Sequence, residues 1–461
     1  MKIPRLLITA GSSGSGKTLV TCGLLQLFKN RGLCTVAFKC GPDYIDPMFH
    51  ESVLHTKSRN LDSFFMGEAG VRASLIKNVN SCDIAVLEGV MGYYDGLGGT
   101  SLRSSAYDVA RLTKTPSILL VNTRGMSLSM IPLIQGFLHY QPDSHIRGVL
   151  LNQMSAMLYP RMKAVIEAEC GVKVLGYLPK MADIHLESRH LGLLKPEEIV
   201  GLKEQVQKVA AVMEETLDFE GILQMAADAP ELEENASLVN ETDTKLPDQT
   251  VHIAVAKDEA FCFFYEDNLQ ILRELGAKLS FFSPIHDKGL PKGTQGILLC
   301  GGYPELYAKE LSENRGMCGD IYQAVTEGIP CMAECGGFLY LQEALEDMNG
   351  ISYPMANVIQ ARAYRTEKLS RFGYVTLKGG KTFGREVGPI PAHEFHYYDS
   401  TDCGSSFAAE KPVGNRKWNC IFSTDTLFAG FPHLHYMGNP EVPKAFLEKA
   451  GEIVREDRSN R

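Results

Sequence analysis

The stretch RLLITAGSSGSGKT, residues 5–18, decides the fold of the first half of the chain. An apolar run leads into Gly11, and after four further residues come Gly16, Lys17 and Thr18. Glycines at this spacing turn backbone N–H groups onto phosphate oxygens, the lysine reaches the β and γ phosphates, and the threonine hydroxyl binds Mg²⁺. Because an apolar strand precedes the loop and a helix follows it, we predict a nucleotide site. Its predicted members are Gly14, Ser15, Gly16, Lys17 and Thr18.

Strands and helices alternate beyond this motif. Apolar strands are predicted at residues 5–10, 34–40, 83–90, 117–123, 147–154 and 172–179, with helices such as 18–30 and 105–113 between them. This order predicts a parallel sheet that is covered on both faces. The alternation restarts with strands at residues 251–258, 278–284 and 296–302. We therefore predict two α/β domains.

An acidic, proline-bounded stretch, DAPELEENASLVNETDTKLPDQT, separates the two halves. Such a composition predicts an exposed linker. The predicted limits are residues 1–225 for the P-loop domain, 226–250 for the linker, 251–445 for the second domain and 446–461 for a charged tail.

Two acidic residues follow predicted strands of the first domain. Asp43 lies in FKCGPDYIDP and Glu88 lies in DIAVLEGVMGYYDG. Ligands gather at the carboxyl ends of parallel strands, so we predict that both acids join Thr18 at a Mg²⁺ ion. Lys39 lies near Asp43 and is a candidate to meet a phosphate or the acid that is being activated. A plain surface lysine is an almost equal alternative.

The loops that carry these acids are predicted binding surfaces. The stretch EGVMGYYDGLGGTS has too many glycines for a regular helix or strand, and loops on a rigid sheet often bind substrates. Tyr44, Ile45 and Asp95 lie on the two loops. Packing within the loop is the alternative for each, and Asp95 can form an Asx turn with Gly96.

A second chemical site is predicted around GIPCMAECGGFLYL. A short strand at residues 329–333 ends just before Cys335 and two glycines, which predicts a nucleophile elbow between strand and helix. The start of the helix is expected to lower the pKa of the thiol. Upstream, GILLCGGYPELY has the same strand-then-glycine form, so backbone N–H groups near Gly302 and Tyr303 are candidates to stabilise an oxyanion.

A thiolate nucleophile also needs a base, and a late histidine is the best candidate. TLFAGFPHLHYMGNP contains His433 and His435, and we predict that His433 is the base. PAHEFHYYD contains His393 and His396 but is not a metalloprotease motif, and we interpret it as a structural or substrate-side loop.

Composition sets broader limits. The chain has 461 residues and a formal charge of −9, which argues against a nucleic-acid or membrane binder. Its twelve cysteines include no C-x-x-C pair, which is typical of a reduced, cytoplasmic protein. The start of the sequence does not read as a signal peptide, and no apolar run approaches a membrane span.

Together these motifs resemble known families. Cys335, Gly302 and His433 match the order of class I glutamine amidotransferase domains, most of which carry H-x-E where this chain has His435, so a Cys-His dyad is expected. The first domain resembles dethiobiotin synthetase and its P-loop relatives, which phosphorylate a carboxylate. KCGPDYIDP, LEGVMGYYDG, CGGYPELY, ECGG, AHEFHYYD and HLHY, in this order, resemble the cobyrinate/hydrogenobyrinate a,c-diamide synthase family over essentially the whole chain.

This resemblance implies a reaction of cobalamin biosynthesis. Cys335 would release ammonia from glutamine with help from His433, and ATP–Mg²⁺ would convert an acetate carboxylate of a cobyrinic acid-type corrinoid into an acyl phosphate. Ammonia would then form the amide, at the a and c positions in turn. The resemblance places substrate contacts on Tyr44, Ile45 and Asp95, and it suggests a homodimer.

Two other functions remain open from the sequence. The chain could amidate another tetrapyrrole, either hydrogenobyrinic acid or nickel-sirohydrochlorin. The P-loop domain also resembles partitioning ATPases, which would make the chain an ATP-driven switch that binds a partner and carries an inactive amidase fold. The retained elbow cysteine and late histidine argue against the switch.

Overall fold

The computed structural model describes residues 1–80, 82–181, 183–184, 196–233 and 250–459. The chain divides into two compact units, Met1–Leu238 and Val239–Arg461. Each is an α/β unit built on a largely parallel sheet, as predicted.

The first unit contains a seven-stranded parallel sheet in the order β3-β2-β4-β1-β5-β6-β7. Six of its strands are those predicted from the apolar runs. The additional strand, Ser58–Leu61, is short and polar (SRNL), which explains why hydrophobicity does not reveal it. The strands are β1 (Arg5–Ala10), β2 (Thr35–Cys40), β3 (Ser58–Leu61), β4 (Ile84–Glu88), β5 (Ser117–Asn122), β6 (Ile146–Asn152) and β7 (Lys173–Leu178).

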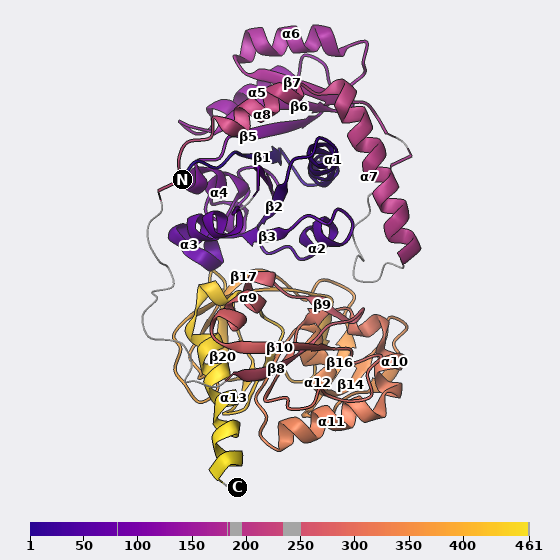
Figure 1. Cartoon of the computed structure of the whole chain (residues 1–461), viewed down its shortest axis with the longest axis vertical. Coiled ribbons are helices and arrows are strands. Elements are labelled where there is room, and N and C mark those ends of the chain that lie inside the picture. Colours follow the sequence, from indigo (N-terminus) through magenta and orange to yellow (C-terminus); the bar gives the residue numbers. More distant parts are fainter. Residues whose placement is uncertain (81, 182, 185–195, 234–249, 460–461) are drawn as a thin grey trace. The chain divides into compact units, whose positions relative to one another are not determined.

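Helices cover both faces of this sheet (Figure 1). On one face α1 packs against α7, and α3 and α4 lie together on the other. Gly23 of α1 permits the first contact, because a Cβ there would lie 2.6 Å from Cγ1 of Val209 on α7. The helices are α1 (Lys17–Asn30), α2 (Ile45–Ser52), α3 (Ser63–Asn78), α4 (Ala106–Thr113), α5 (Met130–His139), α6 (Tyr159–Cys170), α7 (Pro196–Thr216) and α8 (Phe219–Ala227).

The first unit continues beyond its predicted limit at residue 225. The amino terminus donates a hydrogen bond to the carbonyl of Leu232 at 2.7 Å, and Nη2 of Arg5 donates to the carbonyl of Pro230 at 2.7 Å. Ala229 and Leu232 are buried. Residues 226–233 therefore pack against the first unit, and residues 234–249 of the predicted linker lie outside the described residues.

The second unit is built on a six-stranded sheet in the order β10-β8-β11-β13-β23-β22. Its central strands are parallel, and β22 pairs antiparallel at the edge. These strands are β8 (Val251–Ala256), β10 (Ala277–Phe282), β11 (Gly296–Leu299), β13 (Cys331–Glu334), β22 (Phe422–Ser423) and β23 (Leu427–Gly430). The helices are α9 (Glu266–Glu274), α10 (Ala308–Glu313), α11 (Arg315–Thr326), α12 (Gly336–Leu341) and α13 (Glu441–Ser459).

Smaller, mainly antiparallel sheets complete the second unit, and the sequence analysis does not predict them. A five-stranded sheet has the order β21-β20-β17-β18-β24, and a four-stranded sheet has the order β15-β14-β16-β19. A two-stranded ribbon joins β12 to β9. Their bounds are β9 (Phe261–Phe263), β12 (Gly301–Gly302), β14 (Gln342–Glu346), β15 (Ser352–Pro354), β16 (Ile359–Arg365), β17 (Arg371–Lys378), β18 (Ile390–His396), β19 (Tyr398–Ser400), β20 (Phe407–Glu410), β21 (Lys417–Cys420) and β24 (His433–Leu434).

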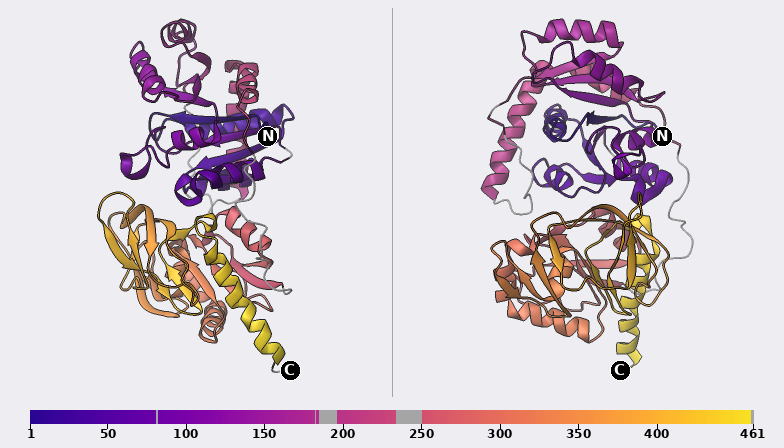
Figure 2. Two further views of the ribbon diagram at one scale, coloured as in Figure 1. Left: turned by 90° about the vertical axis from the view of Figure 1, so that its left-hand side faces the viewer. Right: turned by 180° about the vertical axis from the view of Figure 1, so that it is seen from behind.

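The last helix, α13 (the long yellow helix in Figure 2), spans Glu441–Ser459 and therefore crosses the predicted boundary between residues 445 and 446. Phe446, Leu447 and Ala450 are buried in the same core cluster as residues of β8 and α9. Their helical spacing forms an apolar face that packs against the sheet, so the start of this segment belongs to the second unit rather than to a charged tail.

No helix in the described ranges is both long enough and apolar enough to cross a membrane.

We predict that Phe446→Ala lowers the free energy of unfolding of the second unit by about 3–5 kcal/mol, because it leaves a cavity under α13. Trp418 is the single tryptophan of the chain and lies on β21, so its fluorescence during urea denaturation reports on this unit. Glu452→Gln on the exposed side of the same helix is the control and should change stability by less than about 0.5 kcal/mol. Equal stability of the two variants would contradict the packing role of α13.

Candidate active sites

The P-loop, residues 11–16, connects the carboxyl end of β1 to α1. Gly14 and Gly16 have φ values of 74° and 96°, which L side chains rarely adopt. A Cβ at Gly16 would lie 2.5 Å from Nδ2 of Asn152, and this amide donates to the carbonyl of Ser15 at 2.9 Å. Asn152, the last residue of β6, therefore holds the loop from the same edge of the sheet.

Lys17 is the first residue of α1, and main-chain carbonyls hold its ammonium group. Nζ donates to the carbonyl of Ser12 at 3.0 Å and to that of Met91 at 2.6 Å. Burial, with the positive charge of Lys39, lowers the pKa of Lys17 to about 8. A phosphate would offer this ammonium a full negative charge in place of carbonyl dipoles, so the position suits an anion.

Beside the P-loop, Thr18, Lys39, Asp46 and Glu88 form a buried polar cluster. Oε1 of Glu88 accepts hydrogen bonds from Oγ1 of Thr18 at 2.7 Å and from Nζ of Lys39 at 2.8 Å. Lys39 also forms an ion pair with Asp46, whose Oδ2 lies 3.4 Å from Oγ1 of Thr18. The structure thus brings together three of the residues predicted for this site, and it adds Asp46.

One lysine compensates two carboxylates in this cluster. Burial opposes ionisation of Glu88, but Lys39 and then His50, whose Nε2 lies 3.5 Å from Oε2, hold the pKa of Glu88 below its ordinary value. Burial and the Glu88 charge raise the pKa of Asp46 well above its ordinary value. The carboxylates of Asp46 and Glu88 repel each other, and both lie beside the hydroxyl of Thr18. A hard divalent cation at this place would add positive charge between the two carboxylates, so the arrangement suits such an ion.

Asp43 has a different environment from the one predicted. Its Oδ1 accepts the backbone N–H groups of Ile45 at 2.8 Å and Asp46 at 3.1 Å, so this carboxylate caps the start of α2. Asp46 occupies the place beside Thr18, one helical turn before His50. The spacing of Asp46 and His50 on one helix face is a signal that the sequence analysis overlooks. The rule that ligands follow strands selects Asp43, but it does not distinguish a carboxylate that caps a helix from one that binds a metal ion.

The residues expected to contact substrate lie near this cluster. Tyr44 is the N-cap residue of α2 and is buried, and Ile45 packs partly against the core of the unit. Oδ2 of Asp95 accepts the N–H of Gly92 at 2.9 Å, so its turn involves Gly92. The charge of Asp95 also acts on Lys17. Contact of these three side chains with a substrate stays a prediction.

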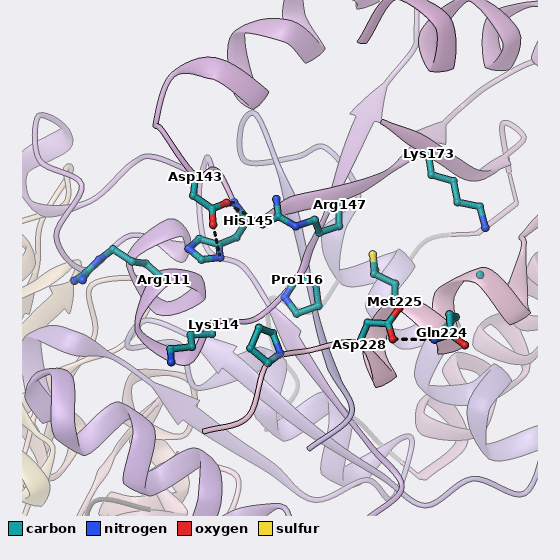
Figure 3. A pocket seen from close by; sticks show the side chains of 12 residues that line it. Arg111, Lys114, Pro116, Asp143, His145, Arg147, Lys173, Gln224, Met225 and Asp228 are labelled. Atoms are coloured by element: carbon teal, nitrogen blue, oxygen red, sulfur yellow. Dashed lines mark hydrogen bonds and ion pairs between the residues drawn. The ribbon is translucent and has the colours of Figure 1, made fainter. Parts of the chain in front are cut away.

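A separate pocket of about 710 Å³ lies in the first unit (Figure 3). Its lining includes Pro116, His145 and Lys173, which precede or begin β5, β6 and β7. The P-loop follows the carboxyl end of β1, and the strands are parallel. The pocket therefore lies at the opposite ends of the strands and is not the nucleotide site.

In the second unit, Cys335 lies at the predicted elbow between β13 and α12. Its φ of 45° and ψ of −102° are rare for a residue other than glycine. The N–H of Cys335 donates to the carbonyl of Gly430 at 2.8 Å, and its carbonyl accepts the N–H of Leu339 at 3.0 Å. A Cβ at Gly337 would lie 2.2 Å from the carbonyl oxygen of Leu299, so a larger residue would disrupt the turn.

The glycine pair of β12 lies against this elbow. A Cβ at Gly336 would lie 3.0 Å from the backbone nitrogen of Gly302. Tyr303 donates its N–H to the carbonyl of Ala260 at 2.9 Å, so this amide is engaged elsewhere. The N–H of Gly336 is the first amide of α12, which no carbonyl within the helix accepts. The arrangement favours Gly302 and Gly336 over Tyr303 as oxyanion donors.

His433 is buried beside the same glycine pair. A Cβ at Gly301 would lie 2.5 Å from Cε1 of His433. Oε2 of Glu334 lies 3.6 Å from Nδ1 of His433, and β18 places His393 directly opposite His433, with ring centroids 5.3 Å apart. Glu334 is not among the predicted residues, although a charged residue in an apolar strand just before Cys335 is an available signal. His393, predicted to lie in a loop, lies instead in β18.

The pKa of Cys335 differs from the expectation. Burial, with the charges of Glu305 and Glu394, raises it above its ordinary value. The helix that follows has only six residues, so its dipole is too small to overcome this burial. The thiol is therefore neutral at rest, and a base must remove its proton when a substrate is attacked.

Models of two families match the two units. Residues 6–194 match the CobQ/CobB/MinD/ParA nucleotide binding domain, and residues 252–440 match the CobB/CobQ-like glutamine amidotransferase domain. A P-loop with its acidic cluster in one unit and a cysteine elbow with a histidine in the other define an ATP-dependent glutamine amidotransferase.

Similar proteins match this chain over nearly their full length. The cobyrinate a,c-diamide synthase of Caldanaerobacter subterraneus subsp. tengcongensis is 37% identical over 457 residues, which cover 98% of this chain and 99% of that protein. The proteins of the same name from Clostridium acetobutylicum (37%; 95% of this chain, 98% of that one) and Listeria innocua (36%; 95% and 97%) are similar to the same extent. The chain belongs to the cobyrinate a,c-diamide synthase family. It carries out glutamine- and ATP-dependent amidation in cobalamin biosynthesis, as predicted.

We predict that Lys39→Met lowers the free energy of unfolding of the first unit by about 3–5 kcal/mol in metal-free buffer, because two buried carboxylates lose their cation. Circular dichroism during urea denaturation measures the change. Lys29→Met, which removes an exposed lysine from the same unit, is the control and should have an effect below about 0.5 kcal/mol. Wild-type stability of Lys39→Met would show that the carboxylates do not depend on this lysine.

Proposed function

We propose that this chain amidates the a- and c-acetate carboxylates of cobyrinate. The observation that carries the proposal is the likeness, across 98% of this chain and 99% of the relative, to a cobyrinate a,c-diamide synthase, in a chain that holds both a P-loop site and a cysteine elbow. The reaction consumes ATP and glutamine at each of the two carboxylates.

Activation of the carboxylate belongs to the first unit. A free carboxylate is a poor acyl donor, since oxide would have to leave, and transfer of the γ-phosphoryl group converts that oxygen into a good leaving group. The amides of the P-loop and Nζ of Lys17 would bind the phosphates, while Lys39, a member of the cluster, would meet an incoming anionic oxygen. Tyr44, Ile45 and Asp95 are the proposed contacts for the corrinoid.

The cluster fits Mg²⁺ by its chemistry. Its donors are one hydroxyl and two carboxylates, and among the described residues Oε2 of Glu88 has no hydrogen-bond partner. Thr18, Asp46 and Glu88 would hold the ion, whereas Asp43 is engaged as a helix cap. When bound, Mg²⁺ neutralises the negative charge that builds up on the β and γ phosphates.

Release of ammonia belongs to the second unit. Sγ of Cys335 attacks the side-chain carbonyl carbon of glutamine while His433 takes the thiol proton, and the N–H groups of Gly302 and Gly336 stabilise the oxyanion. His433 returns the proton to the leaving ammonia. Water then cleaves the thioester and releases glutamate, and ammonia displaces phosphate from the acyl phosphate in the first unit.

The identity of the pigment is tested by product analysis. The protein is incubated with ATP, Mg²⁺, glutamine and one pigment at a time: cobyrinic acid, hydrogenobyrinic acid or nickel-sirohydrochlorin. The masses of the products are then measured by mass spectrometry. Two added amides on cobyrinic acid, with ADP formed, support the proposal. Amidation of only another pigment would assign a different substrate, and ATP consumption without any amidation would favour a P-loop switch.

The assembly and location of the enzyme are also part of the proposal. The family resemblance favours a homodimer in the cytoplasm, and light scattering coupled to size-exclusion chromatography measures the mass of the assembly.

We predict that Cys335→Ala abolishes glutamine-dependent amidation but keeps amidation driven by free ammonia, because only the release of ammonia needs the thiol. Lys17→Ala is the matched variant and should lose both reactions, because phosphate binding fails in each. Initial rates of amide formation with glutamine and with ammonium chloride measure the two activities. Loss of the ammonia reaction in Cys335→Ala would argue against two separate sites.

A further inference from the structure

Glu334 directly precedes Cys335 in the chain and lies beside the proposed catalytic histidine, His433. Its Oε2 is 3.6 Å from Nδ1 of His433 and accepts the backbone N–H of Leu434 at 3.3 Å. Both side chains of this pair are almost fully buried. We propose that Glu334 is a positioning residue for glutamine hydrolysis, one that orients His433 and stabilises it when it carries a proton. This inference rests on the proposed role of Cys335 and His433.

Backbone pairing fixes the relative position of the two residues. Glu334 is the last residue of β13 and pairs with Gly430 of β23, from which the chain continues to His433 within three residues. On its other side, β24 pairs with β18, where His393 lies opposite His433. The carboxylate and the imidazole are therefore held by two sheets and not by a flexible loop.

His435 does not take this role, although it stands where most class I amidotransferase domains carry a glutamate. Its ring centroid lies 4.9 Å from that of Tyr265, and its Nε2 lies 3.9 Å from Oδ2 of Asp267. Burial lowers the pKa of His435 to about 3, so its imidazole ring carries no charge at neutral pH. It has no negative charge to offer to His433.

His393 is the other close neighbour of His433, and it differs from Glu334 in charge. Burial and the neighbouring His433 lower the pKa of His393 well below its ordinary value, so it is also neutral. It can pack against the ring of His433 and limit its rotation. It cannot compensate the positive charge that appears on His433 during the reaction, whereas the Glu334 carboxylate can.

The carboxylate has a defined task in the chemistry. Its negative charge, 3.6 Å from Nδ1, favours the tautomer that carries the proton on Nδ1, which leaves the Nε2 lone pair free to take the proton from Sγ of Cys335. The resulting imidazolium is stabilised by the carboxylate until Nε2 gives the proton to the leaving ammonia. Glu334 itself gains and loses no proton, so removal of its charge should slow the chemical step and leave glutamine binding unchanged.

Glu334→Gln tests this role, since glutamine keeps an oxygen acceptor for the N–H of Leu434 but has no charge. We predict that kcat for glutamine hydrolysis falls by about 10²–10⁴-fold, while KM for glutamine changes by less than about twofold. Amidation driven by ammonia should keep the wild-type rate. Glu343→Gln removes an exposed carboxylate of the same unit and should leave both reactions at wild-type rates.

A spectroscopic measurement separates positioning from simple packing. In protein with ¹⁵N-labelled histidine, the signals of His433, assigned by their loss in His433→Asn, should show the proton on Nδ1 in the wild type and a shifted tautomer balance in Glu334→Gln. Glu334→Asp, which keeps the charge on a shorter chain, should restore part of the lost rate.

The outcomes distinguish this inference from the proposed function. A wild-type protein that forms the diamide with ammonia but does not hydrolyse glutamine would contradict the role of Cys335 and His433. If the wild type hydrolyses glutamine and Glu334→Gln does so with the same kcat, the proposed role of Glu334 alone would be overturned. Equal loss of the glutamine and ammonia reactions, or altered Trp418 fluorescence, would assign Glu334 to folding and overturn it as well.

Discussion

Parallel pairing of strands is the constraint on which both sites depend. In the first unit, β4 lies between β1 and β2, and Glu88 is level with both Ile8 and Lys39. In the second unit, Glu334 is level with Gly430. Because successive side chains of a strand alternate between the two faces, a shift of one residue in either register would turn these groups away from their partners while the backbone hydrogen bonds remained.

The two sites handle buried charge in different ways. The first unit keeps Lys39 between Asp46 and Glu88, so its acids stay paired before any cation or phosphate arrives. The second unit buries the thiol of Cys335, and this burial raises its pKa above the ordinary value. Each arrangement of buried groups suits the reaction proposed for its unit. Phosphate binding requires a field that is present in advance, whereas a thiolate is needed only once its target carbonyl is in place.

The sequence predicts most of the framework and part of the sites. Apolar runs reveal the parallel strands because their burial on both faces leaves a strong signal, and the glycine spacing reveals the P-loop and the elbow. The antiparallel strands of the second unit carry mixed polar and apolar residues and give no such signal. Asp46 and Glu334 each leave a local signal, the spacing with His50 and a charge in an apolar strand. What places them and His393 at the sites, however, is contact with residues distant in the chain. The direction of the Cys335 pKa shift depends on burial, which no local pattern states.

Burial of the elbow also bears on the chemical durability of the enzyme. Peroxides and alkylating reagents react with thiolates far faster than with thiols, and they need access to the sulfur atom. A neutral Cys335 that is 8% exposed meets neither condition at rest. Of the chain's cysteines, Cys34 is exposed, and it would be attacked before the buried Cys335. If Cys335 is the nucleophile as proposed, the same packing that keeps its thiol neutral therefore also shields it from oxidative inactivation between turnovers.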